Sequence, residues 1–186
     1  MNITVYCSAR RKAIEDYGTD VTEIGKYIGS KGHTLVYGGV DFGLMHVVAK
    51  AAAEAGGKVV GVLPERRRLD ECPFNTVTLH VPNLTERKQQ MIEMGDCFLI
   101  LPGGYGTLDE LFATFAELNF NNDQRRKIVI YNPDGIFNHI LGQLEDMGEH
   151  KLFDTDHMNR IVVACDAANC ISALEHISKE YENEEK

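Results

Sequence analysis

The feature that most constrains this chain is the alternation of short apolar runs with longer amphipathic stretches. Runs rich in valine and isoleucine are typical of strands, and stretches whose apolar residues recur every three or four positions are typical of helices. Strands are expected over residues 3–7, 34–37, 58–63, 77–81, 97–101, 127–131 and 160–164, and helices over residues 13–30, 44–55, 84–94, 107–120, 136–147 and 167–180. Strands joined through helices pair in parallel by crossover connections. We therefore predict an α/β fold, a three-layer, doubly wound parallel sheet of Rossmann-like type.

The chain has 186 residues, a length that suits one domain, and it contains no linker, repeat or low-complexity tract. We predict a single domain over residues 1–180 and a frayed acidic tail over residues 181–186.

Composition limits the partners that the protein is expected to bind and the compartment in which it is expected to work. The net charge of −9 argues against broad binding to nucleic acid or to anionic membranes, although the basic clusters at residues 66–68, 87–88 and 125–127 can still form a local cationic pocket. The apolar runs are too short to cross a bilayer, and no signal peptide is expected. Five cysteines without a C-x-x-C pair indicate reduced thiols, a cytoplasmic location and no metal site.

The most informative motif is the turn L-P-G-G-Y-G-T-L-D-E at residues 101–110, where a fully apolar strand runs into three glycines and a helix. Glycines let the backbone approach a ligand, and the unpaired amides of a helix start favour a phosphate. The expected cradle consists of Gly103, Gly104, Tyr105, Gly106 and Thr107. The alternative is an ordinary strand–helix turn capped by Thr107. The motif has neither the lysine of a Walker A loop nor the spacing of a dinucleotide fingerprint.

A second glycine turn, at Gly38 and Gly39, again joins a strand to a helix and leads to Met45. Both turns follow strands, so they are expected at the carboxyl edge of the sheet, where ligands of such folds bind. Alone, the second turn is equally compatible with close helix packing.

Three charged positions are candidates for chemistry. Arg87 and Lys88 lie near the start of a predicted helix, and Glu110 lies one turn into the helix after the first glycine turn. Their alternatives are a solvated helix face and a carboxylate that complements the helix dipole. Asp109 competes with Glu110 for the role of functional carboxylate.

These motifs together resemble the Lonely Guy (LOG) family of cytokinin riboside 5′-monophosphate phosphoribohydrolases. P-G-G-Y-G-T-L-D-E at residues 102–110 matches its PGGxGTxxE signature, and Arg87-Lys88 followed by Met91 matches its upstream R-K-x-x-M. G-G-V-D-F-G-L-M at residues 38–45 is similar to its GGxxGLMG turn. Bacterial members often carry the label lysine decarboxylase, but nothing in this chain suggests the pyridoxal-phosphate lysine which that activity needs.

The resemblance implies hydrolysis of the N-glycosidic bond of AMP or an N6-modified AMP to free base and ribose 5-phosphate. It implies that Arg87 and Glu110 are the catalytic pair, that no cofactor is used and that the protein is a homodimer. The implied substrate contacts are the cradle together with Lys88, Gly38, Gly39, Met45 and Asn119.

The sequence departs from the family pattern in two places. Val40 and Asp41 stand where relatives often have Gly-Ser, with His46 in place of a glycine, so this turn is expected to avoid the phosphate. Residues 116–119 replace a Thr-Trp-x-Gln segment of plant relatives and change the expected base pocket. The alternative function is a non-catalytic carrier of a nucleotide or of the molybdenum cofactor.

Overall fold

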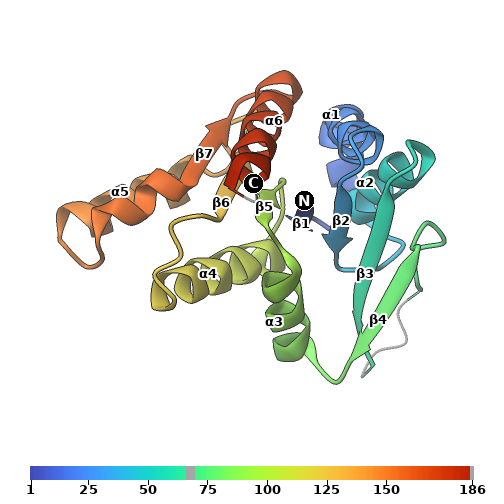
Figure 1. The fold of residues 1–186 in the computed structure, drawn as a ribbon, viewed down its shortest axis with the longest axis horizontal. Helices are drawn as coiled ribbons and strands as arrows, with labels where there is room; N and C mark the ends of the chain where they lie inside the picture. Colours follow the sequence, from blue (N-terminus) through green and yellow to red (C-terminus); the bar gives the residue numbers. More distant parts are fainter. Residues whose placement is uncertain (66–69, 185–186) are drawn as a thin grey trace.

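The computed structural model describes residues 1–65 and 70–184. Its centre is a seven-stranded sheet in which every neighbouring pair is parallel, in the order β4-β3-β2-β1-β5-β6-β7 (Figure 1). The strands are β1 (Asn2–Tyr6), β2 (Thr34–Tyr37), β3 (Lys58–Pro64), β4 (Val77–Val81), β5 (Cys97–Ile100), β6 (Lys127–Tyr131) and β7 (Ile161–Ala164). The predicted doubly wound parallel sheet is confirmed.

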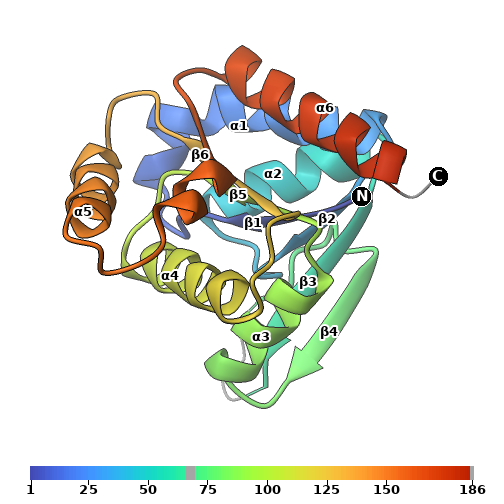
Figure 2. The same cartoon turned by 60° about the vertical axis from the view of Figure 1, so that its left-hand side comes forward.

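Helices cover both faces of this sheet (Figure 2). The helices are α1 (Lys12–Ser30), α2 (Gly43–Glu54), α3 (Leu84–Met94), α4 (Tyr105–Phe120), α5 (Asn138–Glu149) and α6 (Ala167–Glu184), with a 3₁₀ helix, η1, at Thr155–Arg160. One apolar core lies between the sheet and α1, α2 and α6, and a second lies between the sheet and α3 and α4. The central strand β5 is buried at every position because it is covered on both faces, as its uniformly apolar sequence predicts.

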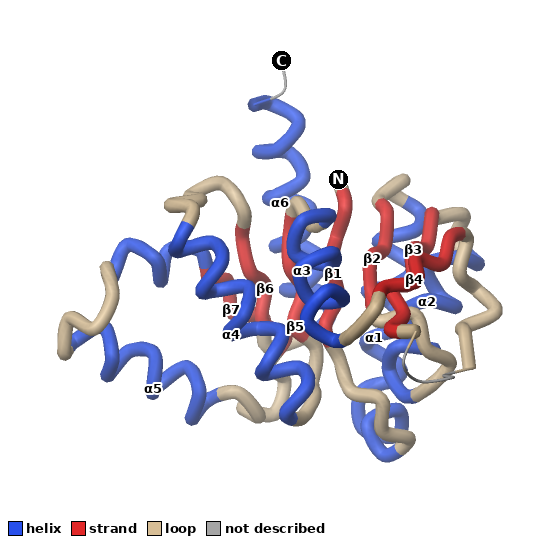
Figure 3. The backbone as a smooth tube through the Cα atoms, turned by 90° about the horizontal axis from the view of Figure 1, so that it is seen from below, coloured by secondary structure: helices blue, strands red, loops and turns tan. Residues whose placement is uncertain are grey.

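The direction of sheet growth reverses between β1 and β5. After β1 the chain adds β2, β3 and β4 on one side, and then returns to place β5 on the other side of β1. The loops that leave β1 and β5 therefore diverge and open a crevice beyond the carboxyl ends of the strands. Figure 3 shows the start of β1 and the end of α6 on the same side of the molecule, opposite the carboxyl ends of the strands.

Some boundaries differ from those predicted. Helix α6 continues to Glu184, beyond the predicted end at residue 180, and the Tyr181 hydroxyl near its end donates to Asp96 Oδ1 at 2.6 Å. The helix η1 was not predicted. The basic cluster at residues 66–68 lies outside the described residues. Within residues 1–65 and 70–184, no helix is both long and apolar enough to cross a lipid bilayer.

Helices α1 and α2 approach so closely that their contact needs glycine. A Cβ at Gly29 of α1 would overlap the carbonyl oxygen of Ala52 and come within 2.9 Å of the Ala55 Cβ. At Gly142, inside α5, a Cβ would meet nothing within 4 Å. The two positions form a matched pair for testing this contact.

We predict that Gly29→Ala lowers the free energy of unfolding by about 1–3 kcal/mol, because the two helix backbones must move apart. Gly142→Ala should raise it by about 0.5–1 kcal/mol, since alanine favours a helix interior. Urea denaturation measures both values. A Gly29→Ala variant as stable as the wild type would show that the close approach of α1 and α2 is wrong.

Candidate functional site

A cavity of about 490 Å³ lies at the carboxyl ends of β1, β2 and β5, where the crevice was expected. Both glycine turns contribute to its wall, which confirms the prediction that they face one crevice. The predicted site residues that line it are Gly38, Met45, Arg87, Gly104, Tyr105, Gly106, Thr107 and Glu110.

The turn after β5 supplies one wall. Helix α4 begins at Tyr105 after an extended Gly104, and no side chain caps its amino end. The first backbone amides of a helix have no acceptor within it, so those of Tyr105, Gly106 and Thr107 are free to bind an anion. A Cβ at Gly104 or Gly106 would meet nothing within 4 Å, so this surface is open to a ligand.

One detail of this turn differs from expectation. Thr107 does not cap the helix, because the helix begins two residues earlier and Thr107 lies inside its first turn. Gly104 has φ −100°, so this glycine is not in the left-handed conformation. Gly103 is required for a different reason: a Cβ there would overlap the Thr107 hydroxyl.

Arg87 enters the cavity from α3 and is held by several partners. Asn83 caps α3, and its Oδ1 accepts the amides of Thr85 at 2.9 Å and Glu86 at 3.0 Å, which fixes the helix start just before Arg87. Arg87 Nε donates to the Val62 carbonyl at 3.0 Å. The rest of the guanidinium lies directly over Gly38, where any Cβ would overlap Arg87 Nη2. Gly38 therefore makes room for the arginine.

Glu110 meets this arginine across the cavity. Its Oε1 lies 3.7 Å from Arg87 Nη1, and only 11% of the Glu110 side chain is exposed. Below it, the Thr114 hydroxyl bonds to the Glu110 carbonyl at 2.8 Å and pairs with the Tyr6 hydroxyl at 3.0 Å. Burial raises the pKa of Glu110 to about 7 and outweighs the opposing attraction of Arg87. The carboxyl group therefore changes charge near neutral pH.

Four predicted substrate contacts do not line the cavity. Lys88 turns away and binds both carboxylate oxygens of Asp109, at 2.7 and 2.8 Å. Asn119 lies near the far end of α4, where its Oδ1 accepts a hydrogen bond from buried Arg160 at 2.8 Å. Gly39, with φ +76°, packs against β3, and Gly103 packs against Thr107 as described above. Lys88 and Asn119 are instead held by partners from other elements of the fold.

The loop after β1 also lines the cavity and was not predicted to do so. Ser8, Ala9 and Arg10 line the cavity, and the Ser8 Oγ accepts the Arg10 amide at 3.0 Å. Backbone bonds from Ser8 to Pro102 at 3.0 Å and from Leu44 to Ser8 at 2.9 Å join the three loops at the crevice. This loop has no glycine signature. Its position after the first strand of a doubly wound sheet was the available signal.

A larger cavity of about 1130 Å³ adjoins the first. Ala9, Met45 and Arg87 line both cavities, so the two spaces meet at Arg87. The other walls of the larger cavity are mainly apolar and include Val40, Phe42, Pro64, Pro82 and Leu84. The site thus combines the uncapped amino end of α4, the Arg87–Glu110 pair and a larger, mainly apolar cavity.

We predict that the stability of the protein depends on pH through Glu110. The carboxyl pKa is about 4.5 when exposed and about 7 here, so the folded protein holds the proton more tightly. The stabilising contribution of protonated Glu110 to the folded state is fully present below pH 4.5 and is lost as the pH rises through 7. The glutamine of Glu110→Gln does not titrate, so the variant does not lose this contribution. The free energy of unfolding of the variant minus that of the wild type should therefore increase by about 3 kcal/mol between pH 4 and pH 8. Denaturant titrations at several pH values measure this, and a constant difference would contradict it.

Comparison with known proteins places the chain in a family. Residues 45–174 match the family model described as "Possible lysine decarboxylase". The rice protein named cytokinin riboside 5′-monophosphate phosphoribohydrolase LOG is 33% identical over 97% of this chain and 75% of its own length. A Rhodococcoides fascians protein named cytokinin riboside 5′-monophosphate phosphoribohydrolase is 33% identical over 93% of this chain and 88% of its own length.

Solved structures share the fold. The molybdenum cofactor carrier protein of Chlamydomonas reinhardtii superposes with a TM-score of 0.75, covering 96% of this chain and 98% of its own. At 21% identity this likeness concerns the fold alone. The sequence matches decide the family: the chain belongs to the LOG family, whose model bears the lysine decarboxylase description.

Proposed function

We propose that this chain hydrolyses the N-glycosidic bond of a purine nucleoside 5′-monophosphate, either AMP or an N6-modified AMP. The products are the free base and ribose 5-phosphate. The observation that carries the proposal is the Arg87–Glu110 pair, 3.7 Å apart, beside the free amino end of α4. The phosphoribohydrolase names of the relatives support the same reaction class.

The two cavities suit the parts of such a nucleotide. The 5′-phosphate fits the amides at Tyr105 to Thr107, with Arg10 at the same wall adding positive charge. The ribose then lies between this turn and the Arg87–Glu110 pair. The base extends past Met45 into the larger cavity, whose apolar walls favour a purine ring and an apolar N6 substituent.

The reaction needs a stabilised cation. The bond between ribose C1′ and the base nitrogen breaks, its electrons leave with the base, and the oxygen of water bonds to C1′ while a proton passes to the base. Positive charge builds on the ribose before water attacks, as in glycoside hydrolysis. The Glu110 carboxylate stabilises that charge or orients the water, and Arg87 donates to ribose or phosphate oxygens.

The carrier alternative rests on fold likeness alone. The molybdenum cofactor carrier structures share the fold, at an identity too low to transfer an activity. The buried carboxylate beside a fixed arginine favours the enzyme, because transport alone gives no use for a charge that stabilises a ribosyl cation. The two functions differ in what happens to bound AMP.

Incubation with AMP tests the proposal directly. We expect adenine and ribose 5-phosphate to appear in equal amounts, measured by chromatography. An N6-isopentenyl AMP substrate, incubated in parallel, tests whether the larger, mainly apolar cavity accepts an N6 substituent. Tight AMP binding without either product would support the carrier and refute the hydrolase.

We predict that Glu110→Gln and Arg87→Ala each lower kcat/KM by about a hundredfold or more, because each removes a charge from the reacting centre. Asp109→Asn is the matched control: Asp109 lies on the same helix, 61% exposed and bound to Lys88. Its kcat/KM should stay within about threefold of wild type, the scale of a surface ion pair. Steady-state kinetics measures kcat/KM for the wild type and the three variants, and circular dichroism serves as the folding control. If Asp109→Asn lost turnover while Glu110→Gln kept it, the assignment of the carboxylate would be wrong.

We also propose a homodimer that uses α4. This helix borders the crevice yet exposes Tyr105 by 94%, Phe112 by 40% and Phe120 by 88%. Exposed aromatic side chains along one helix are typical of a protein interface. Light scattering at micromolar concentration should report about twice the chain mass of 20.8 kDa, and a monomeric mass would refute the dimer.

A further inference from the structure

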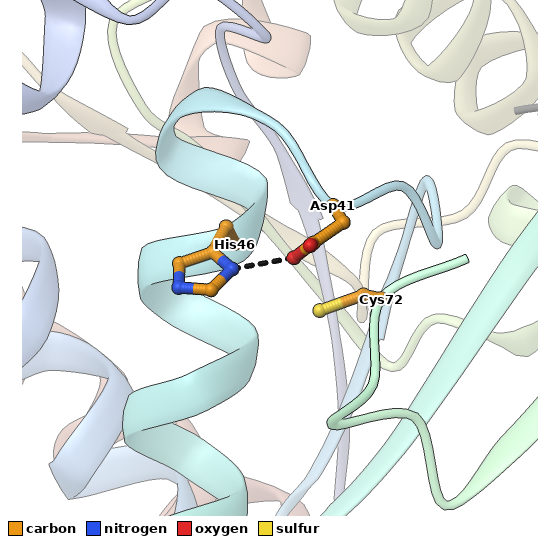
Figure 4. A group of neighbouring side chains, drawn as sticks. All are labelled: Asp41, His46 and Cys72. Carbon is orange, nitrogen blue, oxygen red and sulfur yellow. Dashed lines mark hydrogen bonds and ion pairs between the residues drawn. The ribbon is translucent and has the colours of Figure 1, made fainter. Parts of the chain in front are cut away.

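Three side chains of different chemistry converge beside the second glycine turn (Figure 4). They are Asp41, His46 and Cys72, and their ligand atoms all lie within 4.8 Å of one another. The Asp41 Oδ1 and His46 Nδ1 atoms are 2.5 Å apart, and the Cys72 sulfur lies beside the same carboxylate. Neither Asp41 nor Cys72 lines the two cavities described above. This cluster is therefore separate from the proposed nucleotide site.

The backbone holds the cluster together. Residues 39–41 pair with residues 70–72 as a short antiparallel bridge, through bonds from the Asp41 amide to the Asp70 carbonyl at 3.0 Å and from the Cys72 amide to the Gly39 carbonyl at 2.9 Å. His46 lies on the first turn of α2, and its ring meets the Phe74 ring edge-on, with centroids 5.6 Å apart. The three ligands are thus brought together by elements that are fixed independently of any ion.

The chemistry of the three side chains matches one class of ion. Thiolate and imidazole prefer borderline-soft divalent metals such as Zn²⁺ and Co²⁺ over Mg²⁺ or Ca²⁺. A carboxylate, a thiolate and a neutral imidazole also balance the charge of a divalent cation. We propose that Asp41, His46 and Cys72 bind a zinc-type divalent ion as three protein ligands.

The environment of each ligand agrees with this assignment. Cys72 is buried, whereas the side chains of Asp41 and His46 are 34% and 36% exposed, so an ion can enter from solvent and keep a water as its fourth ligand. Without an ion, burial raises the pKa of the Cys72 thiol, which keeps its proton. Metal binding releases that proton to solvent and forms the bond from sulfur to the metal.

An ion bound to this cluster would hold one wall of the larger cavity in place. Val40 and Phe42 flank Asp41, Met45 precedes His46, and all three line that cavity. An ion bound to the cluster would tie this wall to the segment at residues 70–72. Sequence spacing did not indicate the site, because position 72 is far from positions 41 and 46 in the chain and no C-x-x-C pair is used.

Cobalt substitution tests the assignment without reference to enzyme activity. We expect Co²⁺, titrated into reduced and chelator-treated protein, to bind in a 1:1 ratio. A near-ultraviolet band from sulfur-to-cobalt charge transfer should appear with visible bands of a four-coordinate ion, and Zn²⁺ should abolish both. Cys72→Ser should lose the charge-transfer band, and Asp41→Asn should weaken binding at least about tenfold.

Cys165→Ser is the matched control, because Cys165 is the exposed free cysteine and lies outside the cluster. It should bind Co²⁺ as the wild type does. Zinc should also raise the Tm of the wild type and of Cys165→Ser, but not that of Cys72→Ser. Absence of a charge-transfer band at micromolar Co²⁺ would overturn the proposal. So would a band that survives in a folded Cys72→Ser variant or disappears in Cys165→Ser.

Discussion

The reversal of strand order at β1 and β5 creates the space on which the candidate site depends. A parallel sheet whose strands were added in one direction would cover each carboxyl end with the next crossover. Here the chain leaves β1 toward β2 and leaves β5 toward β6, so the two connections separate. The free end of α4 and the loop after β1 then face each other across the gap, and α3 brings a cation to its side. The reversal thus sets which loops can share a ligand.

The charge state of Glu110 in this crevice is governed by its burial. Glu110 has little contact with water, and a lone carboxylate in such a place favours its neutral form. Arg87 partly offsets this cost from 3.7 Å, without a closer ion pair that would fix the carboxylate in place. The arginine is itself anchored by the Val62 carbonyl. A carboxyl group with these neighbours can respond to a cationic ligand that arrives beside it, since part of its charge remains uncompensated.

Sequence periodicity predicted the strands and the α-helices of the fold because these elements are long enough to show their repeat, whereas the short helix η1 is not. The positions of Arg87, Glu110 and the glycine turns at one crevice also followed, since parallel strands bring their carboxyl ends to one edge. Contacts between distant elements were not predictable in this way. Lys88 and Asn119 are directed by Asp109 and Arg160, and neither pairing leaves a local pattern in the chain.

The start of α4 shows a second limit. A threonine is a good helix cap, and Thr107 was the nearest one to the glycine turn. The helix instead begins at Tyr105, and the uncapped amides at its end face a cavity rather than a side chain. A helix end shaped to receive a ligand lacks the cap by which sequence analysis recognises helix starts.

The overlap between Gly38 and Arg87 also bears on how the family can vary. Any side chain at position 38 would occupy the place of the Arg87 guanidinium. An arginine seated in this place is therefore compatible only with glycine at position 38. In a homologous sequence, a larger residue at position 38 would indicate that the guanidinium group corresponding to Arg87 has moved from this place over the crevice.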